Sequence, residues 1–118
     1  MKTSEAIISF SQSEKVKSGL LWASHAAGLL NGLQGTERQG AEGIVELMVD
    51  LVGNEALLAR RIVKNDAWVE VEKNIDLAKV MVRSGVAQEA AYHLTQALQH
   101  VTSIGSNAMA QLKKEGLL

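Results

Sequence analysis

The stretch from Ala90 to Ala108 reads AAYHLTQALQHVTSIGSNA, and its pattern decides the fold class. Its apolar residues recur at alternating intervals of four and three, at Ala90, Leu94, Ala97, Val101, Ile104 and Ala108. That spacing places them on one face of an α-helix, because an α-helix has about 3.6 residues per turn. Two further stretches have the same spacing: Val16, Leu20, Ala23, Ala27 and Leu30, and Trp68, Val71, Ile75, Ala78 and Val82. The sequence therefore predicts an all-α protein.

Capping motifs and glycines predict where the helices begin and end. Ser11 and Thr36 each stand three residues before Glu or Gln, which is the pattern of a capping box that opens a helix. Asp66 is expected as the N-cap of the third helix, and Gly85 as its left-handed end. The expected helices run from Gln12 to Leu33, from the Thr36 box to Val63, from Asp66 to Ser84 and from Val86 to Glu115.

Four helices on short loops predict an up-down-up-down four-helix bundle over residues 11–118, preceded by an N-terminal arm at residues 1–10. Gly53 and Gly105 fall inside the second and fourth helices. Because the apolar spacing continues across both glycines, we expect each of these helices to be continuous.

Composition limits the class of protein. The 118 residues are 47% hydrophobic, with net charge −1 and no cysteine, so one domain without disulfides, thiolate metal sites or cysteine catalysis is expected. The balanced charge argues against a nucleic-acid partner. The longest apolar-looking stretch, Gly19 to Leu33, is shorter than the roughly 20 residues that cross a bilayer, and the N-terminus lacks a signal peptide core. We therefore expect a cytoplasmic protein without membrane contact.

The second predicted helix is apolar around roughly 200° of its circumference, whereas burial of one side needs a stripe only somewhat over about 100° wide. With turns near residues 35, 65 and 85, the tip of the first hairpin and the tail of the fourth helix should both project past their neighbours. The predicted interface comprises Leu29, Leu33, Ile44, Leu47 and Met48 at the tip, and Ile104, Met109 and Leu112 in the tail. A second copy in a two-fold homodimer is the favoured occupant, and an unknown protein partner is the alternative.

Glu55 falls within the apolar arc of the second helix. An ionised carboxylate there must be paired or hydrogen-bonded, or must have a raised pKa. We expect it to be a buried partner of Lys15, Lys79 or His93. Two alternatives are a role as general base or metal ligand, and a helix break at Gly53 and Asn54 that would open Glu55 to water.

His93 and His100 lie seven residues apart on one flank of the fourth helix, and Glu89 lies one turn before His93. The chain has no Glu-x-x-His motif, no Gly-x-Ser-x-Gly elbow and no phosphate loop. No catalytic residue, metal or cofactor is therefore predicted. The first hypothesis is a non-catalytic, self-associating bundle that serves as an adaptor, regulator or small structural subunit. The alternative is a small-molecule or metal-binding bundle, or an enzyme, with an internal site around Glu55, Glu89, His93 and His100.

Overall fold

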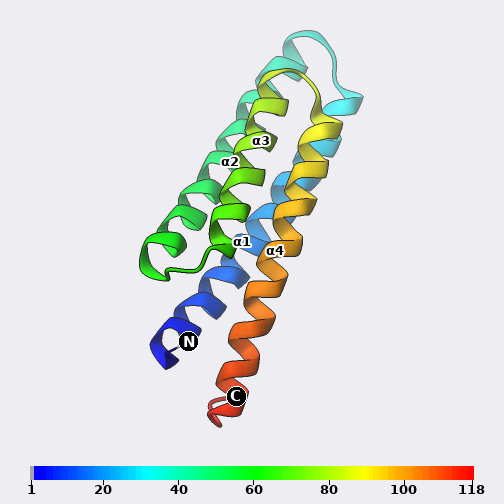
Figure 1. Cartoon of the computed structure of the whole chain (residues 1–118). Coiled ribbons are helices and arrows are strands. Elements are labelled where there is room, and N and C mark those ends of the chain that lie inside the picture. Colours follow the sequence, from blue (N-terminus) through cyan, green and yellow to red (C-terminus); the bar gives the residue numbers. More distant parts are fainter. Residues whose placement is uncertain (1) are drawn as a thin grey trace.

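The computed structural model describes residues 2–118, and in this range the chain forms four α-helices joined by short turns (Figure 1). The helices are α1 (Thr3–Leu29), α2 (Gly35–Ile62), α3 (Ala67–Arg83) and α4 (Ala87–Lys114), with a 3-10 turn, η1, at Leu30–Gly32. Each helix packs extensively on two others, in the order α1, α2, α3, α4 and back to α1. The predicted all-α, up-down-up-down four-helix bundle is confirmed.

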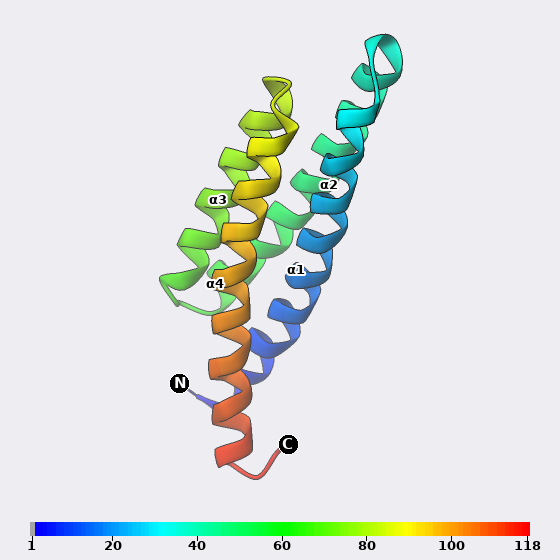
Figure 2. The same ribbon diagram turned by 90° about the vertical axis from the view of Figure 1, so that its right-hand side faces the viewer.

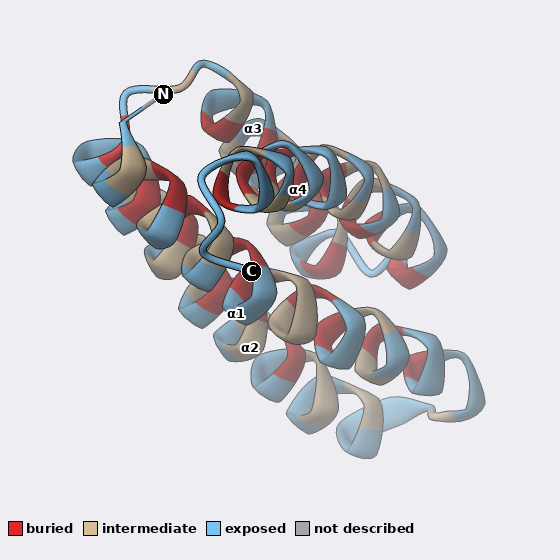
Figure 3. Ribbon diagram, turned by 90° about the horizontal axis from the view of Figure 1, so that it is seen from below, coloured by how far each residue is buried: buried red, intermediate tan, exposed pale blue. Residues whose placement is uncertain are grey.

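The bundle is elongated and consists of two layers. Its extents are 54 × 22 × 17 Å, and the view from below shows the α1–α2 hairpin as one layer and the α3–α4 hairpin as the other (Figure 3). Because α3 has only 17 residues against 27 or 28 in the other helices, the two hairpins do not end at the same level. The α1–α2 tip projects past the α3–α4 turn, and α1 and α4 run past the α2–α3 turn at the other end (Figure 2).

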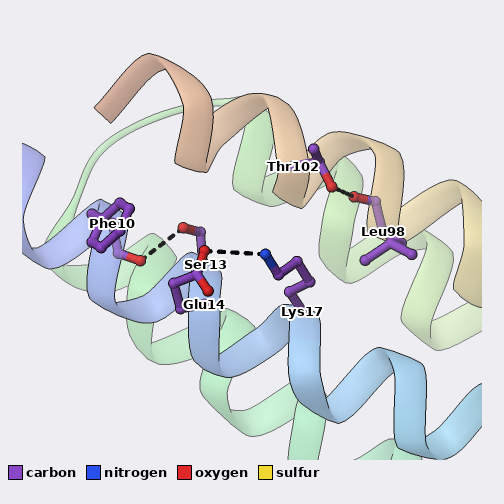
Figure 4. Close-up of polar contacts among 6 residues, drawn as sticks. All are labelled: Phe10, Ser13, Glu14, Lys17, Leu98 and Thr102. Carbon is purple, nitrogen blue, oxygen red and sulfur yellow. Dashed lines mark hydrogen bonds and ion pairs between the residues drawn. The ribbon is translucent and has the colours of Figure 1, made fainter. Parts of the chain in front are cut away.

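The predicted N-terminal arm is wrong, because α1 already begins at Thr3; Met1 lies outside the described residues. Ala6, Ser9 and Ser13 are buried on the same face as the later core residues of α1. Ser13 Oγ donates to the carbonyl oxygen of Phe10 at 2.8 Å (Figure 4), so its hydroxyl is satisfied inside the helix. The Ser11 capping box is therefore unused, and the helix passes through it.

The two other expected caps have different outcomes. No side chain caps α2, whose N-cap is Gln34 and not Thr36. Asp66 stands at the N-cap of α3 as predicted, but its side chain makes no cap hydrogen bond, and the backbone N–H of Ala67 donates instead to Asn65 Oδ1 at 2.9 Å. The expected left-handed residue after α3 is confirmed, since Gly85 has φ 77°.

The core consists mainly of Val, Leu and Ala around one large aromatic side chain, Trp68. Small residues allow close approach at two places. A Cβ added to Gly19 would lie 2.6 Å from Val52 Cγ2, and one added to Gly105 would lie 2.7 Å from Ser13 Oγ. Both distances are below ordinary van der Waals contact. An alanine at position 19 would therefore force α1 and α2 apart, whereas one at position 105 would displace the Ser13 hydroxyl. α2 and α4 are continuous across Gly53 and Gly105, as the sequence predicted.

The two hairpins meet along two seams of different chemistry. The α1–α4 seam has the most extensive contact in the bundle and is lined by small and apolar side chains. The α2–α3 seam is crossed by three ion pairs: Glu46–Arg83 and Asp50–Lys79, each at 2.6 Å, and Arg60–Glu72. Near the tip, Arg38 Nη2 donates to the carbonyl oxygen of Gly85 at 3.0 Å and joins α2 to the α3–α4 turn.

Candidate interaction site

α2 exposes a row of large apolar side chains to solvent, which we call the α2 stripe: Ile44, Leu47, Leu51, Leu58 and Ile62. Their exposed fractions are between 46% and 63%. The intervals of three, four, seven and four residues keep them on one side of the helix. This side is distinct from the buried face of α2, which contains Val45, Val49, Val52, Ala56 and Ala59. The wide apolar arc predicted from the sequence is thus divided between the core and the surface.

α1 extends this apolar surface beside α2. Trp22 is 68% exposed and Leu29 is 73% exposed. Trp22, Met48 and Leu51 line an apolar groove of about 360 Å³ between the two helices. We call the α2 stripe together with Trp22 and Leu29 the α1–α2 face. Trp22 was absent from the predicted interface, although its interval of seven residues from Leu29 places both on one side of α1.

The predicted tip residues lie in this region, with Leu29, Ile44 and Leu47 exposed and Leu33 and Met48 half-buried. The structure therefore places that part of the predicted interface at the surface.

The predicted tail interface is not exposed in the structure. Ile104 and Leu112 are buried and Met109 is half-buried within the single chain. The reason is the early start of α1, whose first turns cover the end of α4. Figure 4 shows Phe10 and Ser13 on α1 and Thr102 on α4, and these three residues line one pocket between the two helices. Thr3 Oγ1 also donates to the Glu115 carboxylate at 2.8 Å at the end of the bundle.

Glu55 lies at the polar end of the α1–α2 groove, where its side chain is 31% exposed. Lys15 Nζ lies 3.3 Å from Glu55 Oε1, and Gln12 Nε2 donates to Oε2 at 3.1 Å. The hydrogen bond from Gln12 lowers the pKa of Glu55 below its ordinary value, and Lys15 acts in the same direction, while partial burial opposes both. Pairing with Lys15 was one of the three expected outcomes. Full burial was not found, and the role of Gln12 was missed.

The side chains of the alternative internal site do not converge. Lys79 pairs with Asp50, not with Glu55. Glu89, His93 and His100 lie on α4, which has no extensive contact with α2, and no hydrogen bond or ion pair joins them to Glu55 within residues 2–118. His93 instead meets the ring of Tyr92 edge-on, with centroids 5.3 Å apart. Over the same residues, no three His, Asp or Glu side chains are placed to hold a metal ion.

We expect Glu55 to make stability depend on pH in the acid range. Because the pKa of Glu55 is lowered in the folded chain, its stabilising contribution is complete above the pKa of the unfolded chain and is lost as pH falls through the folded value. The difference in unfolding free energy between wild type and Glu55→Gln should therefore be largest near pH 7 and narrow toward pH 3. Urea unfolding followed by circular dichroism at several pH values measures it.

The control for this experiment is Asp76→Asn, which neutralises an exposed carboxylate in the middle of α3. Its pH dependence should follow that of the wild type. If Glu55→Gln and wild type lose stability in parallel from pH 7 to pH 3, the Gln12–Glu55–Lys15 contact does not form in solution.

Comparison with protein-family models, with curated proteins and with solved structures finds no match for this chain. No helix within residues 2–118 combines the length and apolarity needed to cross a membrane. The functional argument therefore rests on the surface of the bundle itself.

Proposed function

We propose that this protein is a non-catalytic helical bundle that self-associates through the α1–α2 face and acts through protein–protein contacts, as an adaptor, regulator or small structural subunit. The observation that carries the proposal is the exposure of the α2 stripe and Trp22 on one continuous surface. Contiguous apolar patches larger than a few hundred Å² are uncommon on monomers and mark interaction sites.

The size of the face supports a stable contact. The α2 stripe runs from Ile44 to Ile62, which corresponds to a length of about 27 Å at about 1.5 Å per residue. With α1 packed beside it, the face is roughly 20 Å wide. The resulting area is roughly 540 Å² per chain, or roughly 1,100 Å² for two copies, and a biological interface buries at least roughly 1,000 Å² in total.

The chain also exposes more accessible surface than a monomer of its mass usually does. It is 6800 Å² for a mass of 12.7 kDa, and a monomer of that mass typically exposes roughly 6,200 Å². We propose a second copy of the chain as the occupant of the α1–α2 face, because a two-fold homodimer is the commonest closed assembly.

Replacing Leu51 by aspartate should convert the dimer to a monomer without loss of helix. Burial of one Leu contributes roughly 1.5–3 kcal/mol, and a two-fold interface loses two of them. The dimer dissociation constant should therefore rise roughly a hundredfold or more. Light scattering coupled to gel filtration across a concentration series measures the assembly, and circular dichroism measures the helix content.

The matched control is Val80→Asp, which alters an apolar side chain on α3 that is 51% exposed and lies outside the α1–α2 face. It should keep the wild-type assembly state. A wild-type chain that stays monomeric at millimolar concentration overturns the second copy as occupant. A Leu51→Asp chain that stays dimeric shows that another face makes the contact.

A further inference from the structure

The α2 stripe has the spacing of a coiled-coil seam. Ile44, Leu51 and Leu58 recur every seven residues, and the residues three positions after each are Leu47, Asn54 and Arg61. These two rows correspond to the a and d positions of a heptad repeat, through which two helices pack side chains into each other's gaps. A helix with the same heptad spacing therefore fits this surface. α2 of a second copy is such a helix.

The charges of α2 give this pairing a direction. Residues 35–50 contain four acidic residues and one basic residue, whereas residues 51–64 contain three basic residues and one acidic residue. An antiparallel pair places each acidic half beside a basic half, and a parallel pair places like charges together. Glu46, Asp50 and Arg60 already pair with α3. The exposed residues Glu37 and Lys64, at opposite ends of α2, have no ion pair within residues 2–118 and can pair across the interface.

We propose that two copies pair α2 against α2 in antiparallel orientation, about a two-fold axis that crosses the α2 stripe at the level of Val52 and Gly53 along the helix. Leu47 of one copy then faces Leu58 of the other, and Leu51 faces Asn54. The α1–α2 groove beside Met48 and Leu51 lies at the same level as this axis. This inference rests on the self-association proposed above.

Because the chain has no cysteine, single introduced cysteines report the orientation directly. Leu47→Cys and Leu58→Cys both replace exposed side chains, so the fold should be kept. The two variants, one with a tag that changes its mass, are mixed under reducing conditions, allowed to exchange subunits and then oxidised mildly. Gel electrophoresis without reductant separates the three possible cross-linked species. Val80→Cys on α3 measures cross-linking by random collision.

We expect the Leu47→Cys and Leu58→Cys chains to cross-link to each other at least roughly tenfold faster than the Leu47→Cys chain cross-links to itself. In the antiparallel pair, the two copies of position 47 are about 16 Å apart along the helices, which is beyond disulfide reach. In a parallel pair they are adjacent.

The outcomes separate this inference from the function on which it rests. Rapid cross-linking of the Leu47→Cys chain to itself in a dimeric protein overturns the antiparallel orientation and leaves self-association intact. A dimer in which neither combination exceeds the Val80→Cys rate shows that α2 does not pair with α2. A monomer by light scattering, with no cross-linking above that rate, overturns the proposed self-association itself.

Discussion

Replacing Trp68 by alanine is expected to lower the free energy of unfolding by about 3–5 kcal/mol. Trp68 is the largest fully buried side chain within residues 2–118, at the first turn of α3. Neighbouring core residues are mostly Val, Leu and Ala, which are too short to fill the space left by an indole. Urea unfolding of the two proteins at pH 7, followed by circular dichroism, measures the difference.

Replacing Trp68 by phenylalanine is the informative contrast. The indole Nε1 is buried and has no hydrogen-bond partner among the described residues. Phenylalanine therefore breaks no hydrogen bond, and it eliminates a buried donor that has no partner. The cost should come from the smaller ring alone and stay below half that of Trp68→Ala. A Trp68→Phe chain as unstable as the Trp68→Ala chain would show that the indole N–H has a partner in solution.

The second large effect is expected from Gly19→Ala, which should destabilise the bundle by about 1–3 kcal/mol. In an unhindered helix interior the same change stabilises by roughly 0.5–1 kcal/mol. The sign reverses because the new Cβ would lie 2.6 Å from Val52 Cγ2. Val52 is β-branched and has little rotamer freedom in α2, so α1 and α2 must move apart.

Three further variants test this explanation. Gly43→Ala is the control, because a Cβ there meets no atom within 4 Å, and it should stabilise α2. The double variant Gly19→Ala/Val52→Ala removes the methyl group that clashes with the new Cβ. Its loss of unfolding free energy should therefore be smaller than the sum of the losses of the two single variants. If Gly19→Ala stabilises as much as Gly43→Ala, the close approach of α1 and α2 is absent in solution. Chemical denaturation of the wild type and the four variants measures these differences in unfolding free energy.

The helices of this fold could be predicted because their apolar spacing is long and regular. The spacing also continues through Gly53 and Gly105, which is why two potential breaks could be recognised as continuous helix. The start of α1 could not be found in the same way. Ser9 and Ser13 occupy core positions, but a serine in a sequence is read as a polar residue or a cap. Only packing against α4 distinguishes a buried serine from a capping one.

The interaction site could be predicted where it depends on a single helix. The wide apolar arc of α2 is a property of its own sequence, so the exposed positions at Ile44 and Leu47 were found. The burial of Ile104 and Leu112 depends on where α1 begins. Because the predicted start of that helix was too late in the sequence, these two residues were wrongly predicted to be exposed. The Gln12–Glu55 contact was missed because a neutral amide gives no charge signal in a sequence and its level relative to α2 is set by tertiary packing.

The two seams between the hairpins give the bundle one edge that responds to salt and one that does not. Dissolved ions weaken partly exposed ion pairs and leave apolar contacts almost unaffected. Raised ionic strength therefore weakens the contacts of the α2–α3 seam and leaves those of the α1–α4 seam almost unchanged. Each exposed pair contributes at most about 1 kcal/mol, and buried apolar residues such as Val49 and Ile75 hold α2 and α3 together when the ion pairs are screened. Salt therefore lowers the stability of the bundle only slightly, and it does so from one edge.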